Sequence, residues 1–150
     1  MMKPIKAIIH CSDTEDSGTV SWSAIRKWHT GAHPQSPHKW ADIGYHYGVE
    51  LIGDYYEVLV GRAENVQGAH CYGYNANSLG ICFVGKFDKE PPADRMLMRA
   101  VEVFTPIVNR LMISYDEIKP HSFYEPGKSC PGKAFPMDRF IRSLKLGRWI

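Results

Sequence analysis

The sequence predicts an α/β domain in which a mixed central β-sheet is flanked by helices. Three observations support this fold class: short runs that are apolar on both faces, a hairpin with a Gly-Asp turn, and intervening segments of helical period. Runs of the first kind are typical of strands covered by helices on both sides. At 150 residues, the chain is long enough for one core, so residues 1–150 are expected to form a single domain.

Four strands are expected. Ile5 to His10 is a β-branched run that suits a buried strand ending at a polar site. Residues 45–51 and 55–60 flank the pair Gly53-Asp54, a tight-turn signal, and together they predict a hairpin. Residues 79–84 are apolar at both alternating sets of positions, which indicates a central strand.

Three helices are expected. The first follows Ser21, which can cap it, and ends at Gly31. The longest covers residues 92–112, and Pro106 within it lies opposite the apolar stripe, so a kink or a split is expected near Phe104. A short final helix covers residues 137–146.

Charge and composition exclude several classes of function. The 18 Lys and Arg residues nearly balance the 16 Asp and Glu residues and leave a net charge of +2, too small for a surface that tracks phosphates. Nucleic acid is therefore not an expected partner. The apolar run before His10 is too short for a secretory signal or a membrane span. We expect no membrane insertion and a protein that remains in the cytoplasm on synthesis.

The four cysteines are widely spaced and contain no CxxC pair: Cys11, Cys71, Cys82 and Cys130. Thiols stay reduced in the expected compartment, so no disulfide is predicted and each cysteine is considered singly. Among seven histidines, three have ordinary explanations at a helix end or in a polar loop: His29, His33 and His38. The others stand at strand ends or in Gly-rich turns, where side chains converge in α/β folds: His10, His46, His70 and His121.

The segment from His121 to Gly132 combines a histidine, Lys128 and Cys130 within one Pro- and Gly-rich loop. An imidazole and a thiolate at this separation can meet on one metal ion, and catalytic zinc takes three protein ligands with a fourth position for water. His10 is the best candidate for a second imidazole, because a strand end is held rigidly. The alternative is a buried Cys130 and a surface His121, and spacing alone does not choose between them.

Five blocks of sequence resemble one enzyme family: 9–14, 43–47, 68–75, 78–81 and 128–132. In this order they are similar to the zinc-dependent N-acetylmuramoyl-L-alanine amidases, above all the short phage lysozymes of amidase type, which share their fold with peptidoglycan recognition proteins. The resemblance implies a mixed sheet flanked by helices with a zinc ion in a groove. The loop from His121 to Cys130 is one residue longer than in the phage enzymes, and Ser122 stands where a second histidine can occur.

The resemblance also implies roles for individual residues. It assigns the zinc ligands to His10, His121 and Cys130, and the catalytic roles to Tyr45 and Lys128. The expected substrate-binding residues are His46, His70 and Asn75. Without the family context, Tyr45 would be interpreted as a sheet-edge aromatic and Lys128 as a solvated loop cation.

The implied reaction is hydrolysis of the amide that joins the lactyl group of N-acetylmuramic acid to L-alanine in peptidoglycan. Zinc lowers the pKa of bound water to about 7 and polarises a carbonyl group. A lysine ammonium at Lys128 can stabilise the negative charge that develops on the carbonyl oxygen. Tyr45 is expected to position water or relay its proton, since a phenol with an ordinary pKa of about 10 is a poor base.

The first functional hypothesis is an endolysin of phage or prophage origin that acts on the cell wall after release, and a recycling amidase fits as well. The second is a recognition module that binds muramyl-peptide without cleaving it. Such relatives tend to lack the cysteine ligand, so Cys130 and Lys128 favour catalysis. Some phage amidases also bind and inhibit a phage RNA polymerase, but no residue here indicates such a protein partner. A monomer is expected.

Overall fold

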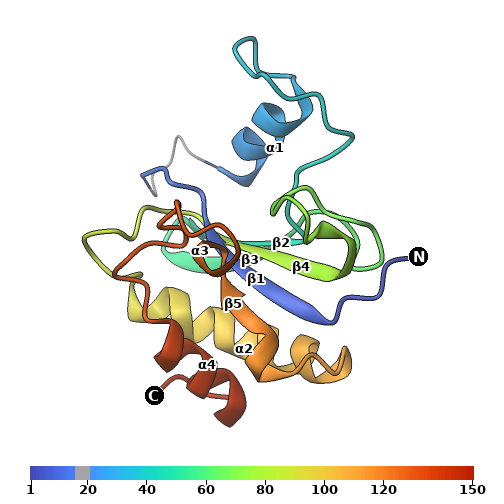
Figure 1. Cartoon of the computed structure of the whole chain (residues 1–150). Helices are drawn as coiled ribbons and strands as arrows, with labels where there is room; N and C mark the ends of the chain where they lie inside the picture. The colour runs from blue at the N-terminus through green and yellow to red at the C-terminus, as the bar shows by residue number, and fades with distance from the viewer. Residues whose placement is uncertain (16–20) are drawn as a thin grey trace.

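The computed structural model describes residues 1–15 and 21–150, which form a five-stranded sheet of order β3-β2-β4-β1-β5. In Figure 1, α1 lies on one face of the sheet, and α2 and α4 lie on the other. The elements are β1 (Lys6–Cys11), α1 (Trp22–Thr30), β2 (Tyr47–Ile52), β3 (Tyr55–Val60), η1 (Asn75–Asn77), β4 (Ser78–Phe83), α2 (Asp94–Arg110), η2 (Tyr115–Glu117), β5 (Ile118–Pro120), α3 (His121–Tyr124) and α4 (Met137–Leu146).

The sheet is mixed, as the sequence predicts. Strand β1 pairs in parallel with both β4 and β5, and β2 pairs in parallel with β4. The hairpin of β2 and β3 supplies the antiparallel pair. Because β1 lies between two parallel neighbours, its carboxyl end is held from both sides.

Alternation along β1 separates the core from the opposite face of the sheet. Ala7, Ile9 and Cys11 join the main hydrophobic core, which also contains buried residues of α2 and α4. Successive strand residues point to opposite faces, so Ile8 and His10 face the side of α1. The α2 side of the sheet therefore provides the main core, and the α1 side combines His10 with a smaller apolar cluster of Trp22, Ile43 and Cys82.

The expected helices form, with one difference. The Ser21 side chain accepts a hydrogen bond from the Ala24 N–H at the start of α1, and Gly31 ends this helix with a φ of 78°. Helix α4 has the predicted bounds. Of the two outcomes expected for the longest helix, a kink or a split, the split is wrong, because α2 runs unbroken through Pro106. Pro106 is exposed, while Phe104 and Val108 remain buried, so the buried face of α2 stays packed.

Three other differences concern short elements. Strand β2 begins at Tyr47, so Tyr45 lies just before the strand instead of within it. Strand β5 has only three residues and α3 only four, and neither length produces a periodic pattern that a sequence reveals. The segment after Pro120, expected to be a loop, therefore starts with one helical turn. Along the described residues, no helix is both long and apolar enough to cross a membrane.

The contribution of the core can be tested at Phe104, whose side chain is fully buried and whose ring centroid lies 5.5 Å from that of Tyr47. We expect Phe104→Ala to reduce the free energy of unfolding by about 3–5 kcal/mol, because it removes buried apolar area and leaves a cavity. Phe123, which is 59% exposed, is the matched control, and Phe123→Ala should cost about 0.5 kcal/mol or less. Equal losses in urea unfolding would contradict this assignment of the core.

Candidate active site

Strand pairing places two histidines side by side. In the parallel register of β1 and β5, Ile9 is the partner of Pro120, so the residues that follow are His10 and His121. Their ring centroids lie 4.5 Å apart. His10 is 1% exposed and His121 6% exposed. Two imidazoles that are 111 positions apart in the sequence thus meet at the carboxyl ends of neighbouring strands.

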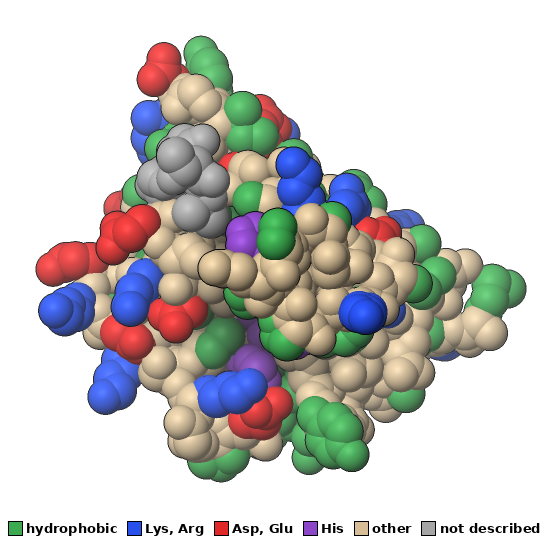
Figure 2. Space-filling model, turned by 90° about the horizontal axis from the view of Figure 1, so that it is seen from above, with side chains coloured by type: hydrophobic (Ala, Val, Ile, Leu, Met, Phe, Trp, Pro, Cys, Tyr) green, Lys and Arg blue, Asp and Glu red, His purple; other side chains and the backbone are tan. Residues whose placement is uncertain are grey.

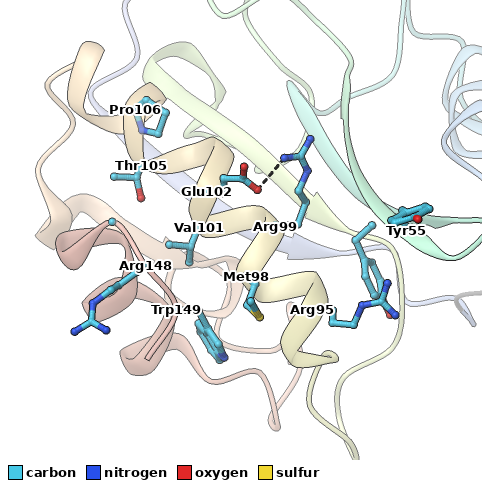
Figure 3. A pocket seen from close by; sticks show the side chains of 12 residues that line it. Tyr55, Arg95, Met98, Arg99, Val101, Glu102, Thr105, Pro106, Arg148 and Trp149 are labelled. Atoms are coloured by element: carbon cyan, nitrogen blue, oxygen red, sulfur yellow. Dashed lines mark hydrogen bonds and ion pairs between the residues drawn. The ribbon is translucent and has the colours of Figure 1, made fainter.

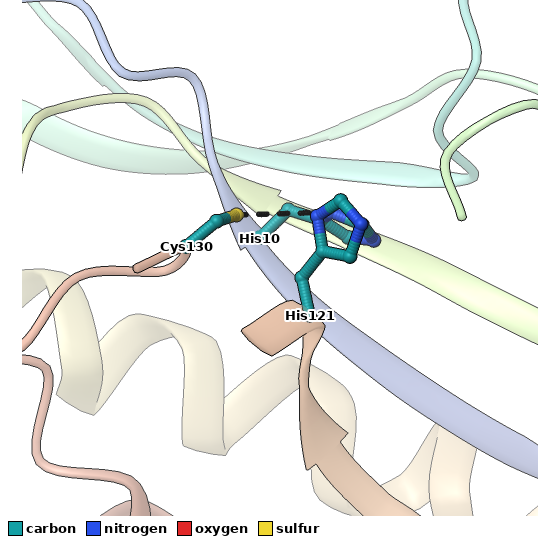
Figure 4. Close-up of side chains that lie close together, drawn as sticks. All are labelled: His10, His121 and Cys130. Atoms are coloured by element: carbon teal, nitrogen blue, oxygen red, sulfur yellow. Dashed lines mark hydrogen bonds between the residues drawn. The ribbon is translucent and has the colours of Figure 1, made fainter. Parts of the chain in front are cut away.

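Cys130 reaches the same point from the loop that follows α3. The Ser122 N–H donates to the Cys130 carbonyl oxygen over 2.9 Å, which folds the loop back onto α3. The Cys11 N–H donates to Cys130 Sγ over 3.2 Å, and Sγ lies 3.8 Å from His10 Nδ1. Figure 4 shows the thiol and the two imidazoles pointing toward one another from the loop, β1 and α3. Their ligand atoms all lie within 4.8 Å of one another.

The second ring nitrogen of each histidine is already engaged. His10 Nε2 lies 2.9 Å from His70 Nδ1, and His121 Nε2 lies 2.9 Å from Glu125 Oε1. In each ring Nδ1 is thereby left available to a metal ion. Hydrogen-bonded imidazoles of this kind are typical of metal ligands, since the outer partner fixes the tautomer and the ring orientation.

The protonation chemistry also suits a metal. Burial, with smaller contributions from His70, His121 and Lys128, lowers the pKa of His10 well below its ordinary value, so this imidazole is neutral at pH 7, as a ligand must be. Contact with the Cys11 thiol, together with burial, raises the pKa of Cys130 in the metal-free chain. A cation reverses that effect, because a coordinating thiol is deprotonated. Two imidazoles and a thiol match the three-ligand donor set of catalytic zinc.

Tyr45 and Lys128 line the same pocket as the three donor residues, with a volume of about 420 Å³. The Tyr45 ring centroid lies 5.2 Å from that of His10. Burial, with contributions from nearby thiols that include Cys82, raises the pKa of Tyr45 well above 10, so its phenol is neutral at pH 7. In Figure 2, which views the α1 side, histidine side chains are visible in recesses of this face among charged side chains.

A neighbouring pocket of about 480 Å³ extends the site toward α1. Tyr45 lines both pockets, and Ile25, Trp28 and His33 are among the residues that line the second one. An apolar and aromatic recess beside a polar centre suits a substrate that is longer than the bond to be cleaved.

The expected substrate-binding residues lie close to this centre, but their contacts are internal. His46 is fully buried; its Nε2 bonds to the Val66 carbonyl oxygen over 2.8 Å, and its Nδ1 accepts from the Gly80 N–H over 2.9 Å. Both nitrogens are thus used by the backbone, which favours a structural role over a substrate contact. Asn75 Oδ1 accepts from the N–H groups of His70 and Cys71 and so shapes the turn that carries His70.

A larger pocket, of about 670 Å³, lies between α2, β3 and the C-terminal segment. Figure 3 shows its arginine, tyrosine and tryptophan side chains and the ion pair of Arg99 with Glu102. Its lining residues, all within the described part of the chain, include no histidine or cysteine. Among the described residues, the two groups that could hold a metal ion, His10-His121-Cys130 and Cys71-His121-Glu125, lie outside this pocket.

One residue near the centre escapes sequence reasoning. Glu125 bonds to His121 and also lies 2.9 Å from Lys128 Nζ. Its spacing of four residues from His121 is the only hint in the sequence, and this spacing brings two side chains together when the segment is helical. The segment is expected to be a loop, so this spacing has no predictive value until α3 is known.

The fold is an α/β domain, and His10, His121 and Cys130 at the end of β1 form a group that could hold a metal ion. A family model described as N-acetylmuramoyl-L-alanine amidase matches residues 1–133. The endolysin of Escherichia phage T7 is 32% identical over 141 residues, which cover 92% of this chain and 85% of that protein. The chain therefore belongs to the N-acetylmuramoyl-L-alanine amidase family, and it is an amidase.

Solved structures agree with the fold. The N-acetylmuramoyl-L-alanine amidase LysC from Clostridium intestinale superposes with a TM-score of 0.78 at 22% identity, covering 96% of this chain and 87% of that one. A peptidoglycan recognition protein, LE, solved in complex with tracheal cytotoxin, a monomeric diaminopimelic acid-type peptidoglycan, gives a TM-score of 0.72 at 25% identity, covering 92% of this chain and 79% of that one.

Buried histidines make the stability of the metal-free chain depend on pH. Burial is the main cause that lowers the pKa of His29 to about 4 and of His70 to about 3, and the pKa values of His10 and His46 are lowered as well. In the unfolded chain these groups titrate near 6.5, so the unfolded state binds more protons below that pH. Their contribution to stability is present above about pH 6.5 and is lost as the pH falls toward 4.

We therefore expect the free energy of unfolding, measured in a chelator, to decrease from pH 7 to pH 4. His29→Asn should flatten this slope, because an amide oxygen can replace the His29 Nδ1 that accepts from the Gly44 N–H without titrating. A stability that does not change between pH 7 and pH 4 would contradict the buried neutral state of these histidines.

Proposed function

We propose that the chain hydrolyses the amide between N-acetylmuramic acid and L-alanine with zinc bound by His10, His121 and Cys130. The observation that carries the proposal is the convergence of these three donor atoms within 4.8 Å of one another. When bound, zinc supplies Lewis-acid activation of water and of the scissile carbonyl. The amidase family is generally zinc-dependent, which supports zinc as the metal.

The catalytic roles fall to the two polar groups that line the pocket with the ligands. Lys128 is exposed and lies in the loop that carries Cys130, so its ammonium can approach a substrate oxygen and stabilise the negative charge that develops there. Tyr45 has a raised pKa and thus keeps its proton. A neutral phenol is a hydrogen-bond donor, so we assign Tyr45 to positioning the attacking water or the carbonyl, not to the role of a base.

Peptidoglycan is the proposed substrate, and the amide in its muramyl-peptide is the proposed reacting bond. The recess at Tyr45 and Trp28 would hold the parts of the substrate beyond the bond. His70, placed against His10, is proposed to act on substrate mainly through that ligand. A recognition module without catalysis is the second candidate, and the presence of Cys130 and Lys128 in one pocket favours the enzyme.

We further propose that residues 1–150 form one amidase domain that serves as an endolysin, acting on the cell wall after release. The matched phage relative is an endolysin. Helix α4, beyond the segment matched by the family, packs on α2 in the same core, which supports a single unit.

Replacing Cys130 tests the metal centre. Cys130→Ser should lose most of its bound zinc, because a hydroxyl is a much poorer zinc ligand than a thiolate. It should also lose amidase activity, measured as the release of new L-alanine amino groups from purified cell wall. Cys71→Ser, at another buried cysteine, should keep one zinc ion per chain. Full activity of Cys130→Ser without zinc would contradict the proposal.

Replacing Lys128 separates charge stabilisation from metal binding. Lys128→Ala should retain zinc and lose activity by a factor of about 10²–10³, the usual effect of removing a donor to a developing oxyanion. Lys133→Ala, at another exposed lysine five positions further along the chain, serves as the control and should keep its turnover. Normal turnover in Lys128→Ala would remove Lys128 from the mechanism.

A further inference from the structure

Glu125 connects a metal-ligand candidate to a catalytic candidate. One of its carboxylate oxygens, Oε1, lies 2.9 Å from His121 Nε2, and the other, Oε2, lies 2.9 Å from Lys128 Nζ. The His121 side chain is 7% exposed and that of Glu125 is 30% exposed. A single carboxylate thus holds two groups of the pocket through different oxygens.

The backbone of the loop brings these three side chains together. His121 opens α3, and the Glu125 N–H donates to the His121 carbonyl oxygen over 3.1 Å. The Lys128 N–H then donates to the Glu125 carbonyl oxygen over 2.9 Å. Residues four apart on one helical turn are neighbours. Local folding therefore brings the Glu125 carboxylate next to the His121 imidazole.

We propose that Glu125 is a positioning residue of this amidase. Its Oε1 accepts the Nε2–H of His121, which fixes the tautomer that leaves Nδ1 free to bind a metal ion. Its Oε2 holds the Lys128 ammonium at the edge of the pocket. This inference rests on the proposed zinc site, and it adds an outer partner to His121 that corresponds to the His70 contact of His10.

A competing role for the same carboxylate is direct metal ligation. Cys71, His121 and Glu125 also place three ligand atoms within 4.8 Å of one another. In that case His121 Nε2 would coordinate a second ion and could not carry the proton that Glu125 accepts. The two roles therefore differ in the number of metal ions per chain.

The first measurement is zinc affinity by chelator competition, a readout that does not depend on activity. We expect the wild-type protein to bind one zinc ion per chain and Glu125→Leu to bind it about 10–100 times more weakly, the usual effect of losing an outer partner. Glu125→Gln should lose less affinity, because its amide oxygen can still accept the Nε2–H. Lys128→Met should bind zinc with nearly wild-type affinity, which separates the two functions of Glu125.

The matched control is Glu102→Leu, since Glu102 forms an ion pair with Arg99 at the same i,i+3 spacing on α2, over 2.9 Å. Its zinc affinity should equal that of the wild type. The second measurement is the ¹⁵N spectrum of the histidine side chains in the metal-free protein. His121 should show a fixed Nε2–H tautomer in the wild type and a mixture of tautomers in Glu125→Leu.

Two results would overturn the inference while leaving the zinc site in place. One is wild-type zinc affinity in Glu125→Leu at one ion per chain. The other is a second zinc ion that both Glu125→Leu and Cys71→Ser abolish, because Glu125 would then be a ligand. A wild-type protein that binds no zinc would overturn both this inference and the proposed function.

Discussion

The parallel pairing of β1 with β5 is the constraint on which the site depends. It aligns Ile9 with Pro120, and this register alone brings His10 beside His121. Strand β1 is also fixed by β4 on its other side, so His10 stands on a rigid element. Cys130 completes the group because the Cys11 backbone N–H, at the end of the same strand, donates to its sulfur. The end of β1 thus positions all three donors.

The face of the sheet opposite the core supplies an environment in which neutral imidazoles are stable. Burial and neighbouring histidines keep the pKa of His10 and His70 low. A cluster of uncharged rings costs less in a low-dielectric site than a cluster of charged ones. Burial therefore keeps these imidazoles unprotonated, which is the form that can bind a metal ion. The same burial makes the stability of the metal-free chain depend on pH.

The sequence predicts much of the fold because the larger elements leave clear patterns. The apolar run that forms β1, the Gly53-Asp54 turn and the apolar period of α2 all correspond to observed elements. It does not predict β5 or α3, which are too short for periodicity and are stabilised by the sheet and by the loop around them. The contacts of Glu125 and His70 also escape prediction, because they depend on how those short elements turn. Residue chemistry alone makes His10, His121 and Cys130 candidate donors but leaves the choice open, and only the family resemblance favours them as a group, because spacing does not show that residue 10 meets residue 121.

We propose that the two imidazoles and the thiol at the end of β1 bind one zinc ion. X-ray absorption at the zinc edge, recorded on the protein loaded with one equivalent of zinc, reports the atoms bound to the metal. We expect one sulfur neighbour at about 2.3 Å and nitrogen neighbours at about 2.0–2.1 Å, with the sulfur contribution absent from the Cys130→Ser protein. A spectrum of the wild-type protein that requires only nitrogen and oxygen neighbours would contradict the claim.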